Sequence, residues 1–276
     1  FIGSPETVVA YALFGKLDAD FTKEPLIGSD GEEFILEPPS GKELPSDGFA
    51  KNKSDELGFI APKPDNSDIT ITVSPTSDRI QLLEPFTAWD GKDYKGLAVL
   101  MKAEGKCTTD HISQAGPWLK YRGHLENISG NMFLGVNNAY AQGEPGVGID
   151  FRDGEHVSLP ELAKKYKDSK ISWIAIGDQN YGEGSSREHA AMEPRFMNGL
   201  VILVRSFARI HEANLKKQGM LPLTFNDPDD YNKILFDDKI DVVELSNLAP
   251  GSQVKVILNH SDGSNEEILT NHTMSD

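Results

Sequence analysis

The sequence has one cysteine, Cys107, among its 276 residues. An intrachain disulfide is therefore excluded, and a single thiolate cannot supply the usual cysteine ligands of an iron–sulfur cluster. Long apolar runs are also missing, since runs such as 200–204 are far too short to span a bilayer. These absences favour a globular protein of a reducing compartment.

Basic residues are scarce relative to acidic ones. The chain has 27 Lys and Arg against 43 Asp and Glu, which gives a formal net charge of −16. This excess disfavours binding to nucleic acid, although a local basic pocket can still hold a small anion. A starting Met and a signal stretch are missing too, so we expect the sequence to be a piece of a longer protein.

The first 78 residues differ in composition from the rest. Residues 4–15 predict a short helix, with Ser4 as its cap, Pro5 at its first position and Gly15 as its stop. Its apolar side chains have no evident partner in the sequence. Prolines and charged residues then dominate, and we interpret about 40–78 as an extended linker. Disorder of residues 45–68 is the alternative.

From residue 79 onward the pattern predicts an α/β domain. Apolar runs favour buried strands, helical spacing favours helices between them, and shorter strands follow toward the end, with Asp262–Gly263 as a hairpin turn. Residues 137–157 are polar and glycine-rich and predict an irregular loop. The expected strands are 79–82, 97–103, 171–176, 199–204, 221–225, 242–245, 253–258 and 266–269, and the expected helices are 159–166, 187–193 and 207–218.

The stretch from Gly177 to His189 is the first candidate site. Gly182 and Gly184 precede an expected helix start, where Ser185 or Ser186 is a natural N-cap. Unpaired N–H groups at a helix start bind anions, and Arg187 adds a planar cation suited to a carboxylate or phosphate. The alternative is an ordinary helix cap without function.

Polar residues elsewhere are weaker candidates. Asp110 and His111 lie in a glycine-bounded loop after a buried strand, either as an acid–base pair or as a turn held by its own side chains. Arg122 is either a second anion ligand or a structural arginine. His211 and Asn214 share a helix face, as a polar seam or because the histidine is simply buried and satisfied.

Four segments together resemble the aconitase family, in particular its mitochondrial form. They are 74–86 (SPTSDRIQLLEPF), 106–113 (KCTTDHIS), 184–189 (GSSREH) and 206–219 (SFARIHEANLKKQG). The resemblance implies a hydro-lyase that interconverts citrate and isocitrate through cis-aconitate. It also implies three regions: 1–50 as the tail of a cluster-side domain, 51–78 as a linker, and 79–276 as the swivelling β/β/α domain.

The resemblance also implies roles for individual residues. Ser185 is then the base that removes the carbon-bound proton, and Ser186 and Arg187 bind substrate beside it. The other substrate-binding residues implied are Arg122, Asp110, Ser113 and His111. Chemically, a serine base needs fixed donors and positive charge to stabilise its alkoxide, and a tricarboxylate needs several cationic groups.

The family uses the open iron of a [4Fe–4S] cluster as the Lewis acid for the leaving hydroxyl. Its cysteines are absent from this chain, so we expect no metal site here and no activity from the chain alone. The partners implied are citrate, isocitrate, cis-aconitate and the cluster-bearing N-terminal domains, in the mitochondrial matrix, without nucleic acid or membrane. Alternatives are a separate swivel subunit, as in isopropylmalate isomerases, a homoaconitase, and an RNA-binding relative.

Overall fold

The computed structural model describes residues 2–41, 45, 61–62, 65 and 68–275, and it divides into two compact units, Phe1–Thr70 and Ile71–Asp276. Half of the expected linker, 51–78, and most of the segment 45–68 lie outside the described residues. In the described part, no helix is long and apolar enough to cross a membrane.

The first unit is a helix with a short hairpin. Helix α1 (Pro5–Phe14) has the predicted caps, since Ser4 accepts a hydrogen bond from the Thr7 amide and Gly15 is left-handed. Strands β1 (Leu26–Ile27) and β2 (Glu33–Phe34) pair antiparallel. Among the described residues of this unit only two alanines are buried, whereas the apolar side chains of α1 at positions 8, 9 and 13 are exposed. The helix therefore presents apolar surface that this unit does not cover.

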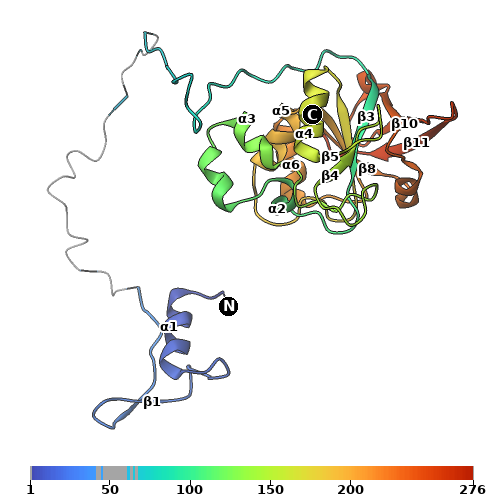
Figure 1. Cartoon of the computed structure of the whole chain (residues 1–276). Coiled ribbons are helices and arrows are strands. Elements are labelled where there is room, and N and C mark those ends of the chain that lie inside the picture. Colours follow the sequence, from blue (N-terminus) through green and yellow to red (C-terminus); the bar gives the residue numbers. More distant parts are fainter. Residues whose placement is uncertain (1, 42–44, 46–60, 63–64, 66–67, 276) are drawn as a thin grey trace. The chain divides into compact units, whose positions relative to one another are not determined.

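The second unit is built on a closed barrel of seven strands (Figure 1). Strands β3 (Tyr94–Lys102), β6 (Trp173–Gly177), β7 (Gly199–Val204) and β8 (Leu221–Phe225) are parallel neighbours in that order. Strands β9 (Lys239–Val243), β10 (Gln253–Asn259) and β11 (Asn265–Asn271) close the barrel through antiparallel pairs. The predicted α/β class is confirmed, and the barrel closure was not predicted.

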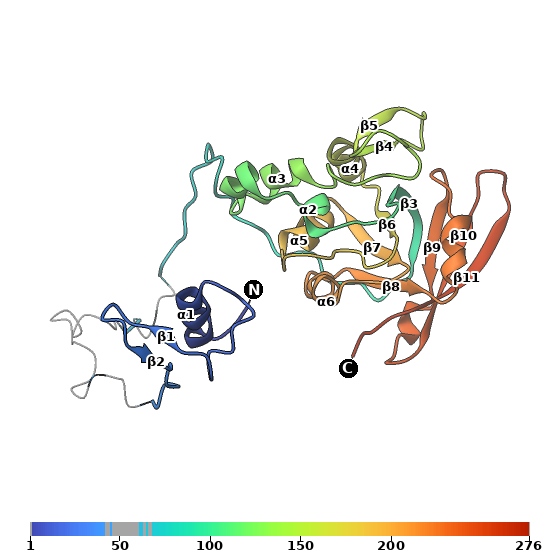
Figure 2. The same ribbon diagram turned by 90° about the horizontal axis from the view of Figure 1, so that it is seen from below.

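Helices connect the parallel strands and lie together beside them (Figure 2). Helices α2 (Thr109–Ile112), α3 (Leu125–Ile128) and α4 (Leu159–Asp168) lie between β3 and β6 in the chain. Helix α5 (His189–Phe196) joins β6 to β7, and α6 (Arg209–Lys217) joins β7 to β8. Short 3₁₀ turns complete the unit: η2 (Gly116–Tyr121), η3 (Ser129–Asn131), η4 (Pro228–Lys233) and η5 (Leu245–Asn247).

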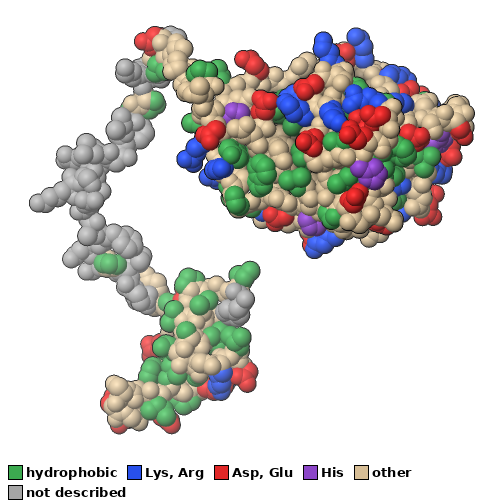
Figure 3. All heavy atoms as spheres, in the orientation of Figure 1, with side chains coloured by type: hydrophobic (Ala, Val, Ile, Leu, Met, Phe, Trp, Pro, Cys, Tyr) green, Lys and Arg blue, Asp and Glu red, His purple; other side chains and the backbone are tan. Residues whose placement is uncertain are grey.

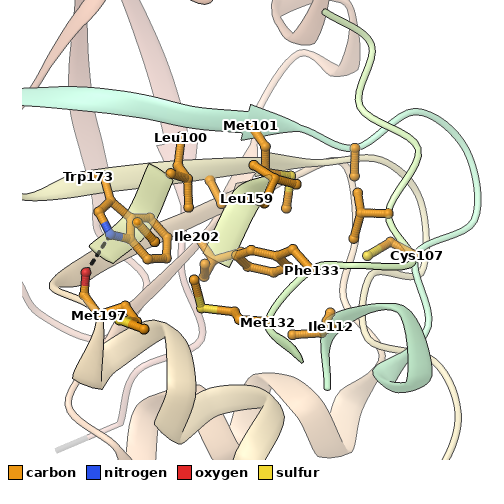
Figure 4. Close-up of a cluster of buried hydrophobic side chains, with 14 of the residues drawn as sticks. Leu100, Met101, Cys107, Ile112, Met132, Phe133, Leu159, Trp173, Met197 and Ile202 are labelled. Atoms are coloured by element: carbon orange, nitrogen blue, oxygen red, sulfur yellow. Dashed lines mark hydrogen bonds between the residues drawn. The ribbon is translucent and has the colours of Figure 1, made fainter. Parts of the chain in front are cut away.

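The apolar strands are buried on both faces, as their unbroken hydrophobic runs predicted. In β6, Trp173 and Ala175 belong to a core shared with the helices, whereas Ile174 and Ile176 belong to a second core with residues of β8 to β11. Figure 4 shows the first core, in which the Trp173 indole donates a 2.7 Å hydrogen bond to the Met197 carbonyl. Acidic and basic side chains are interspersed on the face of this unit seen in Figure 3.

Two expected elements were wrong. Residues 79–82 do not form a strand, because only Ile80 bridges to Gly123, with the Gln81 amide bonded to the Gly123 carbonyl. The expected irregular loop 137–157 contains a hairpin of β4 (Val147–Ile149) and β5 (His156–Ser158). Its pairing depends on long-range packing, since Gly148 lies against Leu159 and Leu162 of α4.

Candidate active site

The two polar loops singled out in the sequence lie side by side. The loop after β3 and the loop after β6 are joined by the Gly182 amide, which donates to the Cys107 carbonyl at 2.8 Å. The Thr109 amide likewise donates to the Glu183 carbonyl at 2.9 Å. Because β3 and β6 are parallel, their carboxyl ends bring these loops to the same edge of the sheet. We call residues 178–188 the serine loop.

The serine loop depends on its two glycines, as predicted. Gly182 has φ +80° and Gly184 has φ +117°, values that side-chain-bearing residues adopt at a cost. Space is also restricted, because a Cβ on Gly182 would lie 2.3 Å from ring atoms of His211. A Cβ on Gly184 would lie 3.0 Å from the Thr109 hydroxyl.

The prediction that Ser185 or Ser186 caps the following helix was wrong. Helix α5 begins at His189, its N-cap is Glu188, and no side chain caps it. The loop instead turns tightly, with the Arg187 amide bonded to the Ser185 carbonyl at 2.8 Å. Both serine side chains are exposed. Their hydroxyls are therefore available to a ligand rather than to the helix.

A groove of about 680 Å³ runs between the serine loop and α6. Ser185, Ser186 and Arg187 line one side of it. Arg209 and Lys217 of α6 add positive charge to the other side. In a chain with a net charge of −16, this groove is suited to a small anionic ligand.

Arg187 is held by residues of the other loop. Its Nη1 atom donates to the Asp110 carboxylate and, at 2.8 Å, to the Ser113 carbonyl. The hydrogen bond from Arg187 holds the pKa of Asp110 below its ordinary value. Three predicted site residues, from segments some 75 positions apart, are thus brought into contact.

His111 and Arg122 are not part of this contact. The His111 ring belongs to the cap of α2, where it accepts the Thr108 amide at 3.3 Å and lies 3.2 Å from the Lys106 carbonyl. The suggested acid–base pair of Asp110 and His111 is therefore wrong, since the two side chains have different partners. Arg122 is exposed, and its carbonyl lies 3.0 Å from the ring nitrogen of His189. That contact places residue 122 beside the start of α5.

Asp178 is an important residue that the sequence interpretation missed. It directly follows β6, and its carboxylate accepts the Gly105 amide at 3.0 Å and Arg205 at 3.0 Å. Burial opposes ionisation, but these hydrogen bonds keep the pKa of Asp178 below its ordinary value. One carboxylate thus ties together the loops after β3, β6 and β7. An Asp immediately after a buried strand was the available signal.

Ser206 directly precedes the expected helix 207–218, where a serine predicts an N-cap, but its role is different. Helix α6 begins at Arg209, and Ser206 does not cap it. Its hydroxyl accepts the Asn180 amide at 2.8 Å, and its carbonyl accepts the Tyr181 amide at 2.9 Å. Ser206 therefore fixes the first half of the serine loop from the adjacent β7 end.

His211 lies under the serine loop and is buried, 2% exposed. Among the residues that the structure describes, neither of its ring nitrogens has a hydrogen-bond partner. Burial lowers its pKa to about 4, so the ring is neutral near pH 7. The simple expectation of a satisfied buried histidine is thus wrong, and no polar seam with Asn214 is formed through hydrogen bonds of the ring.

The residues that the structure describes contain no group of three or more His, Cys, Asp or Glu side chains arranged to hold a metal ion. Cys107 is buried at 2% exposure, and burial raises the pKa of its thiol. The thiolate is the form that ligates metal, so Cys107 is chemically unsuited to that role. An iron–sulfur cluster does not fit the described residues.

Comparison with known proteins gives the family. The model of the aconitase C-terminal domain matches residues 97–228, which run from within β3 to beyond β8 and include every candidate residue discussed above. The chain carries an aconitase C-terminal domain. Over its full length it is 52% identical to a mitochondrial aconitate hydratase of Gracilaria gracilis and 50% identical to that of Saccharomyces cerevisiae.

The matched region covers 100% of this chain but 35% of each of these aconitases. The chain therefore spans about a third of the length of the curated relatives it matches. A solved 3-isopropylmalate dehydratase from Methanocaldococcus jannaschii aligns with 66% of this chain and 84% of its own, at a TM-score of 0.42 and 18% identity. A likeness of that strength carries no argument about function.

Proposed function

We propose that this chain is the C-terminal part of an aconitate hydratase that interconverts citrate and isocitrate through cis-aconitate. The observation that carries the proposal is the serine loop. In a chain about 50% identical to mitochondrial aconitases over its full length, this loop presents two exposed serines beside Arg187, whose guanidinium donates to the Asp110 carboxylate of the loop after β3. That arrangement is suited to binding a carboxylate substrate next to a hydroxyl base.

Ser185 is the proposed base that removes the carbon-bound proton of the substrate. A serine alkoxide is scarcely populated in water, so it requires nearby positive charge and exclusion of water. Helix α5 starts four residues later, at His189, and so the charge of Arg187 and the loop amides supply this stabilisation rather than the first helical turn. The exposure of Ser185 in this chain implies that another part of the protein covers it in the active state.

The other site residues bind the substrate carboxylates. Arg187 and Ser186 are adjacent to the base, and Asp110 and Ser113 hold Arg187 in a fixed direction. Arg122 is the second proposed carboxylate anchor, from the segment beside α5. For His111 we propose only a place in the pocket wall, because its ring is engaged in the cap of α2.

The iron–sulfur cluster of such an enzyme lies outside this chain. One buried cysteine with a raised pKa cannot hold it, so the chain contributes the base and the carboxylate anchors alone. The proposed partners are the cluster-bearing domains that precede this sequence in the same polypeptide, in the mitochondrial matrix. Within the chain, we propose 1–50 as the tail of the preceding domain, 51–78 as the linker and 79–276 as the swivelling domain.

The test compares this chain with a longer protein that begins with the preceding domains. We expect cis-aconitate formation from citrate by the longer protein and none from this chain. Turnover by the pure chain contradicts the proposal. Activity that requires a separately encoded cluster-bearing chain identifies a small subunit instead, and preference for homocitrate over citrate identifies a homoaconitase.

A further inference from the structure

Glu193 is a fully buried carboxyl group in helix α5, six residues after Arg187. Its exposed fraction is 0%, and its Oε1 atom lies 2.7 Å from the Ser113 hydroxyl. In the described part of the chain, its other oxygen, Oε2, has no hydrogen-bond partner. Its burial is not evident from the sequence, because a glutamate in a helix is ordinarily solvated.

No cation compensates this carboxyl group. Only two causes act on its pKa: burial raises it, and the hydrogen bond from Ser113 lowers it by less, which leaves a value of about 9. The ionisable groups on the neighbouring α3 and α6, and Arg195 on α5 itself, make no contribution. Glu193 is therefore a neutral carboxylic acid near pH 7.

Ser113 connects this acid to the site. Its side chain contacts Glu193, and its carbonyl accepts the 2.8 Å hydrogen bond from Nη1 of Arg187. Ser113 is itself buried, 2% exposed, so its position is fixed by these contacts and the surrounding core. The chain of contacts runs from Glu193 through Ser113 to Arg187, on three segments that are distant in sequence.

We propose that Glu193, as a neutral acid, is a positioning residue that fixes Ser113 and through it the guanidinium of Arg187. This inference rests on the proposed function, in which Arg187 binds a substrate carboxylate. The Ser113 hydroxyl donates to Oε1 of this carboxyl group, and the carboxyl oxygen thereby fixes the orientation of Ser113. A glutamine at position 193 presents the same acceptor oxygen without a charge, whereas an alanine removes it.

The protonation state is tested on this chain alone. Infrared difference spectra of wild type and Glu193→Gln are expected to show a protonated carboxylic acid band that persists up to about pH 9. Stability gives a second readout, because the unfolded carboxyl releases its proton above its ordinary pKa of 4.5, whereas the folded one keeps it. From pH 5 to pH 8.5 the Tm of wild type should fall relative to that of Glu193→Gln by on the order of 10 °C.

Positioning is also tested without turnover. In the chain labelled with ¹⁵N-arginine, the Nε–H signal of Arg187 should exchange faster with water in Glu193→Ala, and no faster than wild type in Glu193→Gln. The matched control is Asp238→Ala, which removes another fully buried carboxyl group, one bonded to His260. Equal exchange of Arg187 in all four proteins overturns the proposal.

Activity is measured in the longer protein. Glu193→Ala should lower kcat/KM for citrate about 10- to 100-fold, mostly through KM, because a displaced Ser113 weakens its hydrogen bond with the charged Arg187. Glu193→Gln should stay within about threefold, and Ser113→Ala combined with Glu193→Ala should lose no more than the larger single loss. An activity loss equal to that of Asp238→Ala shows a merely structural role. If wild type does not act on citrate, the proposed function fails. The infrared and exchange results then still show whether Glu193 is protonated and whether it positions Arg187.

Discussion

The two sides of the barrel differ in whether their buried polar groups have hydrogen-bond partners. On the parallel side, residues between Thr109 and His211 include every buried side-chain atom without a hydrogen-bond partner in the described part of the chain. On the antiparallel side, buried polar groups are paired, for example Asp238 with His260 at 2.8 Å and Thr270 with the Val254 carbonyl at 2.8 Å. An unpaired buried polar atom costs about 1–3 kcal/mol. Unpaired buried polar atoms therefore lower the free energy of unfolding on the parallel side, which carries the serine loop. The antiparallel side, which closes the barrel, has its buried polar groups paired.

The two histidines of this comparison have opposite pKa shifts. Burial lowers the pKa of His211 to about 4, because the ring lies in the core without a partner. The hydrogen bond to Asp238 raises the pKa of His260 above its ordinary value. The pKa shift of the first histidine favours the neutral ring beside the candidate site, and that of the second favours the protonated ring at the barrel closure. The same residue type therefore reports two different local environments.

The largest effect should come from Gly182→Ala, with Gly251→Ala as the matched control on the antiparallel side. Both glycines have φ near +80°, but a Cβ meets the His211 ring at Gly182 and nothing within 4 Å at Gly251. We expect the free energy of unfolding to fall by about 3 kcal/mol or more for Gly182→Ala and by about 1 kcal/mol for Gly251→Ala. The difference arises because only the first substitution adds a steric clash to the backbone strain. Urea unfolding of this chain measures both. Equal losses of unfolding free energy would show that the serine loop rearranges around the added methyl group and that α6 does not hold it in place.

A smaller effect is expected from His211→Gln, which stays neutral at all pH values. Since the folded pKa of His211 lies below its ordinary value of 6.5, the unfolded state binds more protons between about pH 6.5 and 4. Wild type should therefore lose about 2 kcal/mol of stability more than the variant as pH falls from 7 to 4.5. Thermal unfolding over this range checks the slope, with His260→Gln as the control.

The control should behave in the opposite sense. The raised pKa of His260 gives a stability contribution that is present below its ordinary pKa and is lost as pH rises through the folded value. His260→Gln should therefore remove stability at the acid end and little at the alkaline end. Parallel pH curves for His211→Gln and His260→Gln would contradict the contrast between the two sides of the barrel.

Local patterns predicted much of this fold. The apolar runs that became β3, β6, β7 and β8, the caps of α1 and the glycines of the serine loop follow from short-range rules, and the structure has them. Ser185 and Ser206 show where such rules fail. Each serine precedes an expected helix and was predicted as its N-cap, yet the helices begin at His189 and Arg209. Contacts between adjacent strand ends hold these loops in other conformations.

The residues of the candidate site were predicted from the sequence, but the contacts between them were not. Arg187, Asp110 and Ser113 were named from the sequence, but their mutual contacts depend on the parallel pairing of β3 and β6. Asp178 and Glu193 were missed for the same reason. Asp178 bonds to Gly105 and Glu193 bonds to Ser113, each more than 70 positions away. The place of Asp178 directly after a buried strand was a signal for a role, but no local pattern identifies either distant partner.

The most direct test of the central claim is citrate dehydration by the longer protein before and after Ser185→Ala, with Ser186→Ala measured in parallel. Loss of a general base lowers kcat by about 10²- to 10⁴-fold, and the account predicts this loss for Ser185→Ala with little change in KM. Ser186→Ala should act mainly on KM, because that hydroxyl is proposed to bind substrate. Full activity of Ser185→Ala would contradict the account and leave the serine loop as a binding surface only.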